Sequence, residues 1–90
     1  MKYRNFSNTG WKVSELGLGC WGLGGSWTDI TKKNALLILD KSLEKGVNFF
    51  DTSDAYGHGV SEQIIGNFLK KKNRKVIVAT KIGTKLKPFF

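Results

Sequence analysis

The sequence has very few of the residues that hold small secreted or metal-binding domains together. In 90 residues there is one cysteine, Cys20, one histidine, His58, and one proline, Pro88. A single cysteine excludes an intramolecular disulfide and fits a reducing compartment. We expect Cys20 to be a small buried apolar residue. We expect no metal site.

Long apolar runs are also missing. No stretch of the sequence approaches the roughly 20 apolar residues of a membrane-spanning helix. The opening residues, M-K-Y-R-N-F-S-N, lack the apolar segment of a signal peptide. We therefore expect a cytoplasmic protein without membrane insertion.

Acidic residues are scarce, because fifteen Lys and Arg face seven Asp and Glu and give a formal net charge of +8. Such a balance is typical of proteins that bind nucleic acids or acidic membranes. Here the excess lies largely in K-K-K-N-R-K at 70–75, where a helix is expected to end, and in Lys85 and Lys87. The helix dipole favours cations at such an end. No basic-aromatic interleaving marks a base-stacking surface, so we interpret the excess as solvated charge and expect no nucleic-acid partner.

What the sequence does contain is an alternation of strand and helix patterns. The turn-like S-N-T-G at 7–10, between short segments with apolar residues, predicts a β-hairpin within residues 1–15. Three further strands are predicted by L-G-L-G-C at 16–20, V-N-F-F-D at 47–51 and K-V-I-V-A-T-K at 75–81.

Two helices are predicted between these strands. Thr31 is the expected N-cap of the first helix, and Gly46 stands where a left-handed C-terminal cap is needed. The second helix is predicted from Ser61 to Lys72. Apolar stripes at helical spacing mark the buried faces of the two helices: Ala35, Leu36, Leu39 and Leu43, then Ile64, Ile65, Phe68 and Leu69. A hairpin followed by β-α-β-α-β implies parallel strands and an α/β fold, either a barrel or a doubly wound sheet.

Polar residues stand at the carboxyl ends of the second and third predicted parallel strands, where both architectures place function. These are Asp51 and Lys81, with Tyr56 in the loop after Asp51. A phenol titrates near ~10, and an ammonium group beside it favours the phenolate, while a carboxylate keeps the ammonium charged. Such a tyrosine can give a proton to a carbonyl oxygen as hydride reaches the carbon. Singly, the three residues have structural alternatives: a turn cap, a solvated strand end and a loop packing residue.

The run at 46–66, G-V-N-F-F-D-T-S-D-A-Y-G-H-G-V-S-E-Q-I-I-G, resembles the signature of the aldo/keto reductase family. The segments at 8–25 and 76–81 resemble the hairpin with the first strand, and the third strand, of that family. The resemblance covers nearly the whole chain, with the motifs in the right order. It implies the N-terminal part of a (β/α)8 TIM barrel, with the hairpin in 1–15 and three barrel strands and two helices in 16–90.

The family resemblance also implies NADPH-dependent reduction of an aldehyde or ketone. It assigns Tyr56 as the proton donor, Lys81 as the group that makes the phenol more acidic, and Asp51 as the partner of Lys81. Trp21 and Gly22 match positions that line the cofactor and substrate site, and Asp51 is placed with them as a cofactor-binding residue. We expect a small carbonyl compound as the substrate.

Other residues of the Gly-rich loop and its neighbours are less informative. Trp27 is predicted either near the substrate pocket or as a packed loop aromatic. His58 matches a variable loop position of the family, whose catalytic histidine follows a later strand, so we expect no catalytic role for it. Gly22, Gly24 and Gly25 lack the G-x-G-x-x-G spacing of a dinucleotide fingerprint, and in this family later segments hold the cofactor phosphates.

Length is where the sequence departs from the family. A barrel of this type typically needs about 250 residues, and this chain has 90. We expect a fragment that is inactive and marginally stable by itself, because two strand edges and a sheet face lack their partners. Two alternatives to an enzyme stay open: a regulatory relative, of the kind that serves as an auxiliary subunit of membrane channels, and an inert gene remnant.

Overall fold

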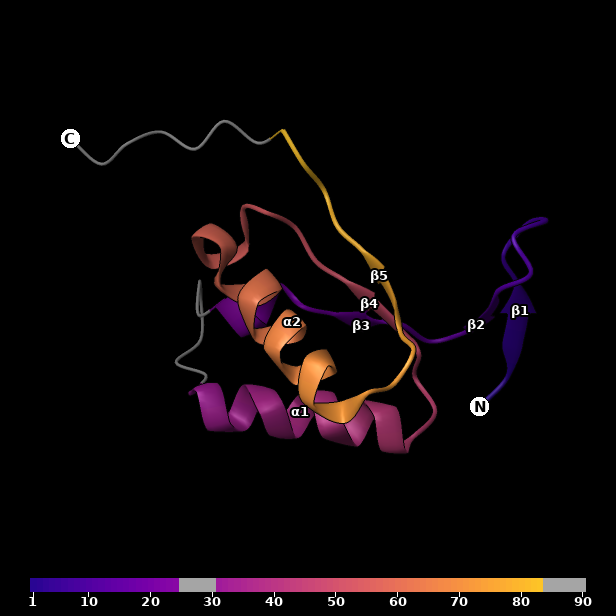
Figure 1. The fold of residues 1–90 in the computed structure, drawn as a ribbon, viewed down its shortest axis with the longest axis horizontal. Helices are drawn as coiled ribbons and strands as arrows, with labels where there is room; N and C mark the ends of the chain where they lie inside the picture. Colours follow the sequence, from indigo (N-terminus) through magenta and orange to yellow (C-terminus); the bar gives the residue numbers. More distant parts are fainter. Residues whose placement is uncertain (25–30, 84–90) are drawn as a thin grey trace.

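The computed structural model describes residues 1–24 and 31–83 of the chain. Figure 1 shows the hairpin at one side of the molecule and the helices gathered against the remaining strands. The elements, in chain order, are β1 (Tyr3–Asn5), β2 (Lys12–Ser14), β3 (Leu18–Gly19), η1 (Trp21–Gly24), α1 (Lys32–Glu44), β4 (Phe49–Asp51), η2 (Tyr56–Gly59), α2 (Val60–Lys72) and β5 (Ile77–Ala79). The predicted order of a hairpin and then β-α-β-α-β is confirmed, although each strand is shorter than predicted and the two 3-10 turns were not predicted.

The hairpin pairs β1 with β2 in antiparallel fashion, with Tyr3 opposite Ser14. Asn48, which directly precedes β4, joins this hairpin to the rest of the protein. Its side-chain oxygen accepts the Ser14 backbone N–H at 2.8 Å, and its side-chain nitrogen donates to the Lys12 carbonyl at 2.8 Å. The Tyr3 hydroxyl adds a hydrogen bond of 2.7 Å to the Gly46 carbonyl.

Strands β3, β4 and β5 form a parallel sheet in that order. The register places Gly19, Asp51 and Ala79 next to one another at the carboxyl edge. The backbone pairing of β4 with β5 continues past the strands, because Thr52 N–H donates to the Ala79 carbonyl at 2.7 Å and Asp54 N–H donates to the Lys81 carbonyl at 3.1 Å. The segments that follow the two strands are therefore also joined by backbone hydrogen bonds.

Helix α1 has the two caps that the sequence predicts. The Thr31 hydroxyl accepts the Asn34 N–H at 3.1 Å, which satisfies one of the free N–H groups of the first turn. At the other end Gly46 has φ +92°, and its N–H donates to the Leu43 carbonyl while Val47 N–H donates to the Ser42 carbonyl. This pair of bonds is a Schellman motif, which needs a left-handed residue at the glycine position.

Both helices lie on the same side of the β3–β5 sheet and contact each other (Figure 1). Burial follows the predicted stripes, with Leu36 and Leu69 only partly buried against the core. The core between sheet and helices consists of Cys20, Leu23, Ala35, Leu39, Leu43, Phe50, Ile64, Ile65 and Phe68. Within the two described ranges, no helix is long and apolar enough to cross a membrane.

Candidate active site

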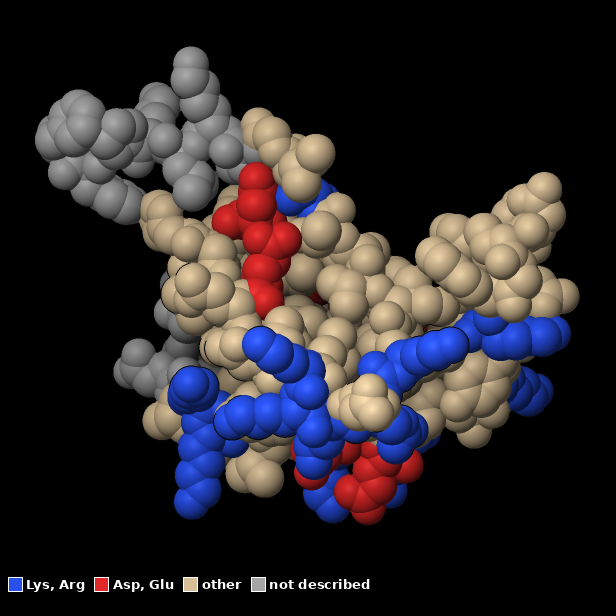
Figure 2. Space-filling model, in the orientation of Figure 1, with Lys and Arg blue, Asp and Glu red and all other residues tan. Residues whose placement is uncertain are grey.

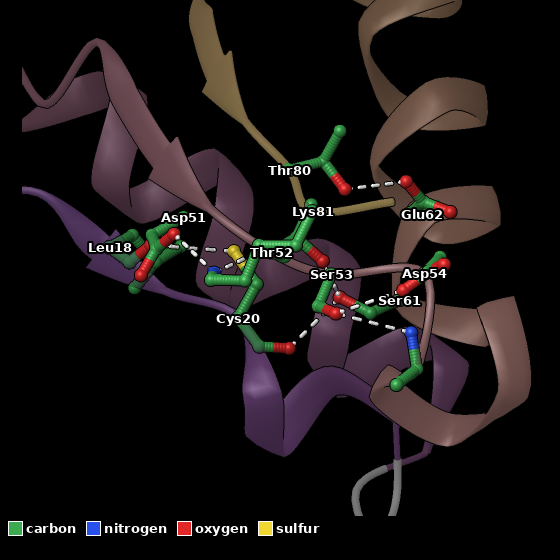
Figure 3. A network of polar contacts seen from close by, with 11 residues as sticks. Leu18, Cys20, Asp51, Thr52, Ser53, Asp54, Ser61, Glu62, Thr80 and Lys81 are labelled. Carbon is green, nitrogen blue, oxygen red and sulfur yellow. Dashed lines mark hydrogen bonds and ion pairs between the residues drawn. The ribbon is translucent and has the colours of Figure 1, made fainter. Parts of the chain in front are cut away.

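The carboxyl edge of the parallel sheet brings Asp51 and Lys81 together, although they are thirty positions apart in the sequence. Asp51 is the last residue of β4, and Lys81 follows β5. The Lys81 ammonium donates to Asp51 Oδ1 at 3.0 Å and to the Thr52 carbonyl at 2.9 Å (Figure 3). The lysine is therefore held between one side-chain and one backbone acceptor.

Tyr56 completes this group, as the sequence pattern predicts. The Lys81 Nζ lies 5.5 Å from the centroid of the Tyr56 ring, within the range of a cation–π contact. The loop that carries the tyrosine is closed by hydrogen bonds to Ser53, whose carbonyl accepts Tyr56 N–H and whose hydroxyl accepts Ala55 N–H, both at 3.2 Å. The structure thus assembles Asp51, Tyr56 and Lys81 at one place.

The electrostatics of the site favour a charged lysine. The hydrogen bond that Lys81 donates to Asp51 is the largest cause that raises the pKa of Lys81 above its ordinary value, and Tyr56 adds a smaller contribution. The Lys81 and Asp51 side chains are 55% and 47% exposed, so water and small molecules reach them. At neutral pH the site therefore presents an accessible ammonium next to a phenol.

A left-handed turn leads from Tyr56 into α2. Gly57, His58 and Gly59 have φ values of +61°, +54° and +93°. Glycine adopts this region without strain, and histidine is among the residues that tolerate it better than most. The G-H-G sequence therefore lets the chain reverse immediately after the tyrosine and start a helix.

Trp21 and Gly22 belong to η1, which follows β3 and contacts η2, the turn that begins with Tyr56. The Trp21 side chain is exposed, and the preceding Cys20 N–H donates to the Asp51 carbonyl at 2.8 Å. Both residues thus lie at the same sheet edge as Asp51, and their cofactor contacts stay a prediction. Trp27 lies outside the described residues.

Cys20 is a buried core residue, as predicted from the sequence. Burial, with a smaller effect of the Asp51 carboxylate, raises the pKa of its thiol to about 11. A thiol with so high a pKa carries almost no thiolate at neutral pH and is a poor nucleophile. In residues 1–24 and 31–83, no group of three or more His, Cys, Asp or Glu side chains is placed to hold a metal ion.

Sequence reasoning missed several polar residues around the site. Thr52 and Ser61 are buried and joined by a hydroxyl–hydroxyl contact of 2.8 Å. The Thr80 hydroxyl donates to Glu62 Oε2 at 2.6 Å, so a carboxylate in the first turn of α2 holds the residue that follows β5 (Figure 3). The available signal was the placement of Thr52 and Thr80 directly beside Asp51 and Lys81 in the sequence.

The sequence model of the Aldo/keto reductase family matches residues 15–88. This chain belongs to the aldo/keto reductase family. Among curated proteins it is similar to an uncharacterized oxidoreductase of Bacillus subtilis, with 40% identity over 86 residues, which are 94% of this chain and 26% of that protein. It is also similar to an aldo-keto reductase of the same organism, with 38% identity over 84 residues, which are 90% of this chain and 25% of the relative.

Solved structures agree with these relatives. An aldo-keto reductase from Bacillus halodurans, in its holo form, matches with a TM-score of 0.81 and 38% identity over 97% of this chain and 28% of its own. The glycerol dehydrogenase of Gluconobacter oxydans matches with a TM-score of 0.80 and 34% identity over 91% of this chain and 25% of its own. The predicted fold class, the N-terminal part of a TIM barrel, is confirmed. The chain spans about a quarter of the length of the curated relatives it matches.

Proposed function

We propose that this chain supplies the proton-transfer residues of an NADPH-dependent reductase that converts an aldehyde or ketone to an alcohol. One observation carries the proposal: the Lys81 ammonium is bonded to Asp51 at 3.0 Å and lies 5.5 Å from the Tyr56 ring. An ammonium beside a phenol stabilises the negative charge that appears on the phenol oxygen when its proton leaves. Membership of an oxidoreductase family supports the same chemistry.

In this proposal Tyr56 is the proton donor. When bound, NADPH supplies a hydride, with its electron pair, to the carbonyl carbon. The Tyr56 O–H bond breaks, its proton forms an O–H bond on the carbonyl oxygen, and the product is an alcohol. The phenolate that remains faces the Lys81 ammonium and regains a proton from water, while the Asp51 carboxylate keeps Lys81 charged throughout.

The residues present fit the reactive end of a nicotinamide cofactor better than its phosphates. The exposed Trp21 ring offers a flat apolar surface near the carboxyl edge that holds the Lys81–Asp51 pair. The basic residues that phosphates require gather elsewhere: Lys70, Lys71 and Lys72 are in the last turn of α2. In Figure 2 most of the basic side chains cover the lower part of the molecule, away from the acidic stretch near the top.

The names of two relatives support small carbonyl and alcohol substrates. One curated relative is the pyridoxal 4-dehydrogenase of Microbacterium luteolum, at 32% identity, and one solved structure is a glycerol dehydrogenase. We propose a small carbonyl compound as the substrate and the cytoplasm as the location. We also propose that the chain by itself is inactive, because the run of basic residues at the end of α2 does not lie beside the Lys81–Asp51 pair.

A hybrid enzyme tests this proposal. The matching segment of the Bacillus subtilis aldo-keto reductase is replaced by this chain, which gives what we call the hybrid reductase. We expect it to oxidise NADPH in the presence of small aldehydes. Lys81→Met is expected to lower kcat on the order of a hundredfold, because the charge that stabilises the phenolate is lost.

The control variant is Lys72→Met, which removes a second lysine that is also bonded to an aspartate at 3.0 Å but lies at the end of α2. It should leave kcat unchanged. Far-ultraviolet circular dichroism on each variant shows whether it is folded, and the NADPH affinity shows whether it binds the cofactor. Two results would contradict the proposed function. One is a folded hybrid reductase that binds NADPH and reduces no aldehyde. The other is a kcat that Lys81→Met leaves unchanged.

A further inference from the structure

Two buried hydroxyl groups lie next to the candidate active site, on the residue that follows Asp51 and in the first turn of α2. The Thr52 and Ser61 side chains, 1% and 0% exposed, are 2.8 Å apart between Oγ1 and Oγ. The Ser61 hydroxyl donates to the Cys20 carbonyl at 2.9 Å. Serine has one hydroxyl proton, so Thr52 must be the donor in the pair that it forms with Ser61. A chain of hydrogen bonds therefore runs from the end of β4 through α2 to the end of β3 (Figure 3).

Every polar group of Thr52 is engaged in a different direction. Its N–H donates to the Ala79 carbonyl of β5 at 2.7 Å, and its hydroxyl bonds Ser61 of α2. Its carbonyl accepts the Lys81 ammonium at 2.9 Å. The Thr52 backbone cannot rotate without breaking bonds to both neighbouring elements, and breaking buried bonds is costly.

The two acceptors of Lys81 differ in how freely they can move. Asp51 contributes a side chain that is 47% exposed and can change its rotamer at small cost. The Thr52 carbonyl is backbone, and it belongs to a residue whose N–H and hydroxyl are both hydrogen-bonded. The Thr52 carbonyl is therefore the less mobile of the two acceptors that hold the ammonium near Tyr56.

We propose that Thr52 and Ser61 form a positioning pair for Lys81: their hydrogen bond fixes the Thr52 carbonyl and so holds the ammonium beside Tyr56. The consequence for catalysis rests on the proposed function, whereas the consequence for Lys81 does not. If the two hydroxyls served only to fasten α2 to the sheet, their loss would reduce stability and leave the environment of Lys81 unchanged.

The test compares two replacements of Thr52 that disturb the protein in opposite ways. Thr52→Val keeps the shape and removes the hydroxyl, while Thr52→Ser keeps the hydroxyl and leaves a small cavity. The titration of Lys81 is followed by NMR of lysines labelled with carbon-13 at Cε, in the 90-residue chain and in the hybrid reductase, with Lys81→Met to assign the signal. NADPH affinity and kcat are measured in the hybrid reductase.

For Thr52→Val we expect the raised pKa of Lys81 to fall toward the ordinary value of a lysine. We expect kcat to fall about tenfold, the equivalent of one lost hydrogen bond, with NADPH affinity unchanged. Thr52→Ser is expected to restore both quantities although its cavity lowers stability. Ser61→Ala should behave like Thr52→Val, because it removes the acceptor of the same bond.

The matched control is Ser14→Ala in β2 of the hairpin, next to Asn48, which precedes β4. Ser14 is also buried, and its hydroxyl bonds the Leu16 carbonyl and the Asn48 N–H. This variant should lose stability and keep the Lys81 titration of the wild type. The inference is wrong if Thr52→Val leaves that titration unchanged, or if the Val and Ser variants alter it equally. Failure of the proposed function would instead appear as a folded, NADPH-binding hybrid reductase without turnover, and the titration result would stand.

Discussion

Two lysines of this chain make almost the same contacts in two different places. Lys72, at the end of α2, is bonded to Asp40 at 3.0 Å and lies 5.8 Å from the ring centroid of Phe68. Lys81, at the carboxyl edge of the sheet, is bonded to Asp51 at 3.0 Å and lies 5.5 Å from the ring of Tyr56. The exposure of the two ion pairs is also similar.

What separates the two sites is what surrounds the ion pair. Phe68 is part of the core and carries no ionisable group, whereas Tyr56 carries a phenol. Lys81 also has a second acceptor, the Thr52 carbonyl, which buried hydrogen bonds hold in place. An ion pair with an aromatic neighbour is therefore no sign of a site by itself. The phenol and the second acceptor of the ammonium are what distinguish the carboxyl edge.

Among changes to the two ion pairs, the largest effect is expected when their carboxylates are neutralised in the hybrid reductase. Asp51→Asn should lower kcat on the order of a hundredfold, near the lower end of what a positioned proton donor contributes. Asp40→Asn, the same change at the other pair, should leave kcat unaltered. Steady-state kinetics at saturating NADPH measure both, and equal effects of the two variants would remove the distinction drawn between the pairs.

The same Asp51→Asn variant has a distinct pH dependence. Because Asp51 raises the pKa of Lys81 above 10.5, the folded protein holds this proton more tightly than the unfolded chain. The stabilisation is complete below pH 10.5 and is lost as the pH rises through the folded pKa. We expect the free energy of unfolding of the wild type to fall in this alkaline range more steeply than that of Asp51→Asn. Parallel curves from urea denaturation would show that the carboxylate does not act on Lys81.

A smaller effect, confined to stability, is expected at the amino end of the sheet. Asn48→Ala leaves the Ser14 N–H and the Lys12 carbonyl without the amide that pairs with both. The first of these hydrogen bonds is part-buried and the second is exposed. Their loss should reduce the free energy of unfolding by about 1–3 kcal/mol. The kcat of the hybrid reductase per folded molecule should not change. A fall in kcat greater than the loss of folded protein would mean that the two ends of the sheet are coupled.

The smallest effect is expected for the Lys72–Asp40 pair. Its side chains are 43% and 51% exposed, so solvent screens their attraction, and a double-mutant cycle should give a coupling energy below about 1 kcal/mol. The cycle uses Lys72→Met, Asp40→Asn and the double variant, each measured by urea denaturation. A clearly larger coupling energy would show that an exposed ion pair of this geometry stabilises the fold.

Local chemistry made much of the fold predictable from the sequence. Helix α1 begins after Thr31 because the threonine hydroxyl accepts a free N–H of the first turn. It ends before Gly46 because glycine tolerates the left-handed backbone of the C-terminal cap. The grouping of Asp51, Tyr56 and Lys81 followed from strand ends that meet at one edge of a parallel sheet. The Thr52–Ser61 bond was not predictable, because it depends on the angle at which α2 docks on the sheet, and serine near a helix start is ordinarily interpreted as a cap.

One substitution tests the central claim most directly, because Tyr56→Phe makes the aromatic neighbour of Lys81 the same residue type as that of Lys72. In the hybrid reductase we expect this loss of one hydroxyl to lower kcat by about 10²–10⁴-fold, with NADPH affinity almost unchanged. Tyr3→Phe, which removes the only other tyrosine hydroxyl in the sequence, should keep kcat at the wild-type level. A Tyr56→Phe variant that reduces aldehydes as fast as Tyr3→Phe would show that Tyr56 is not the proton donor.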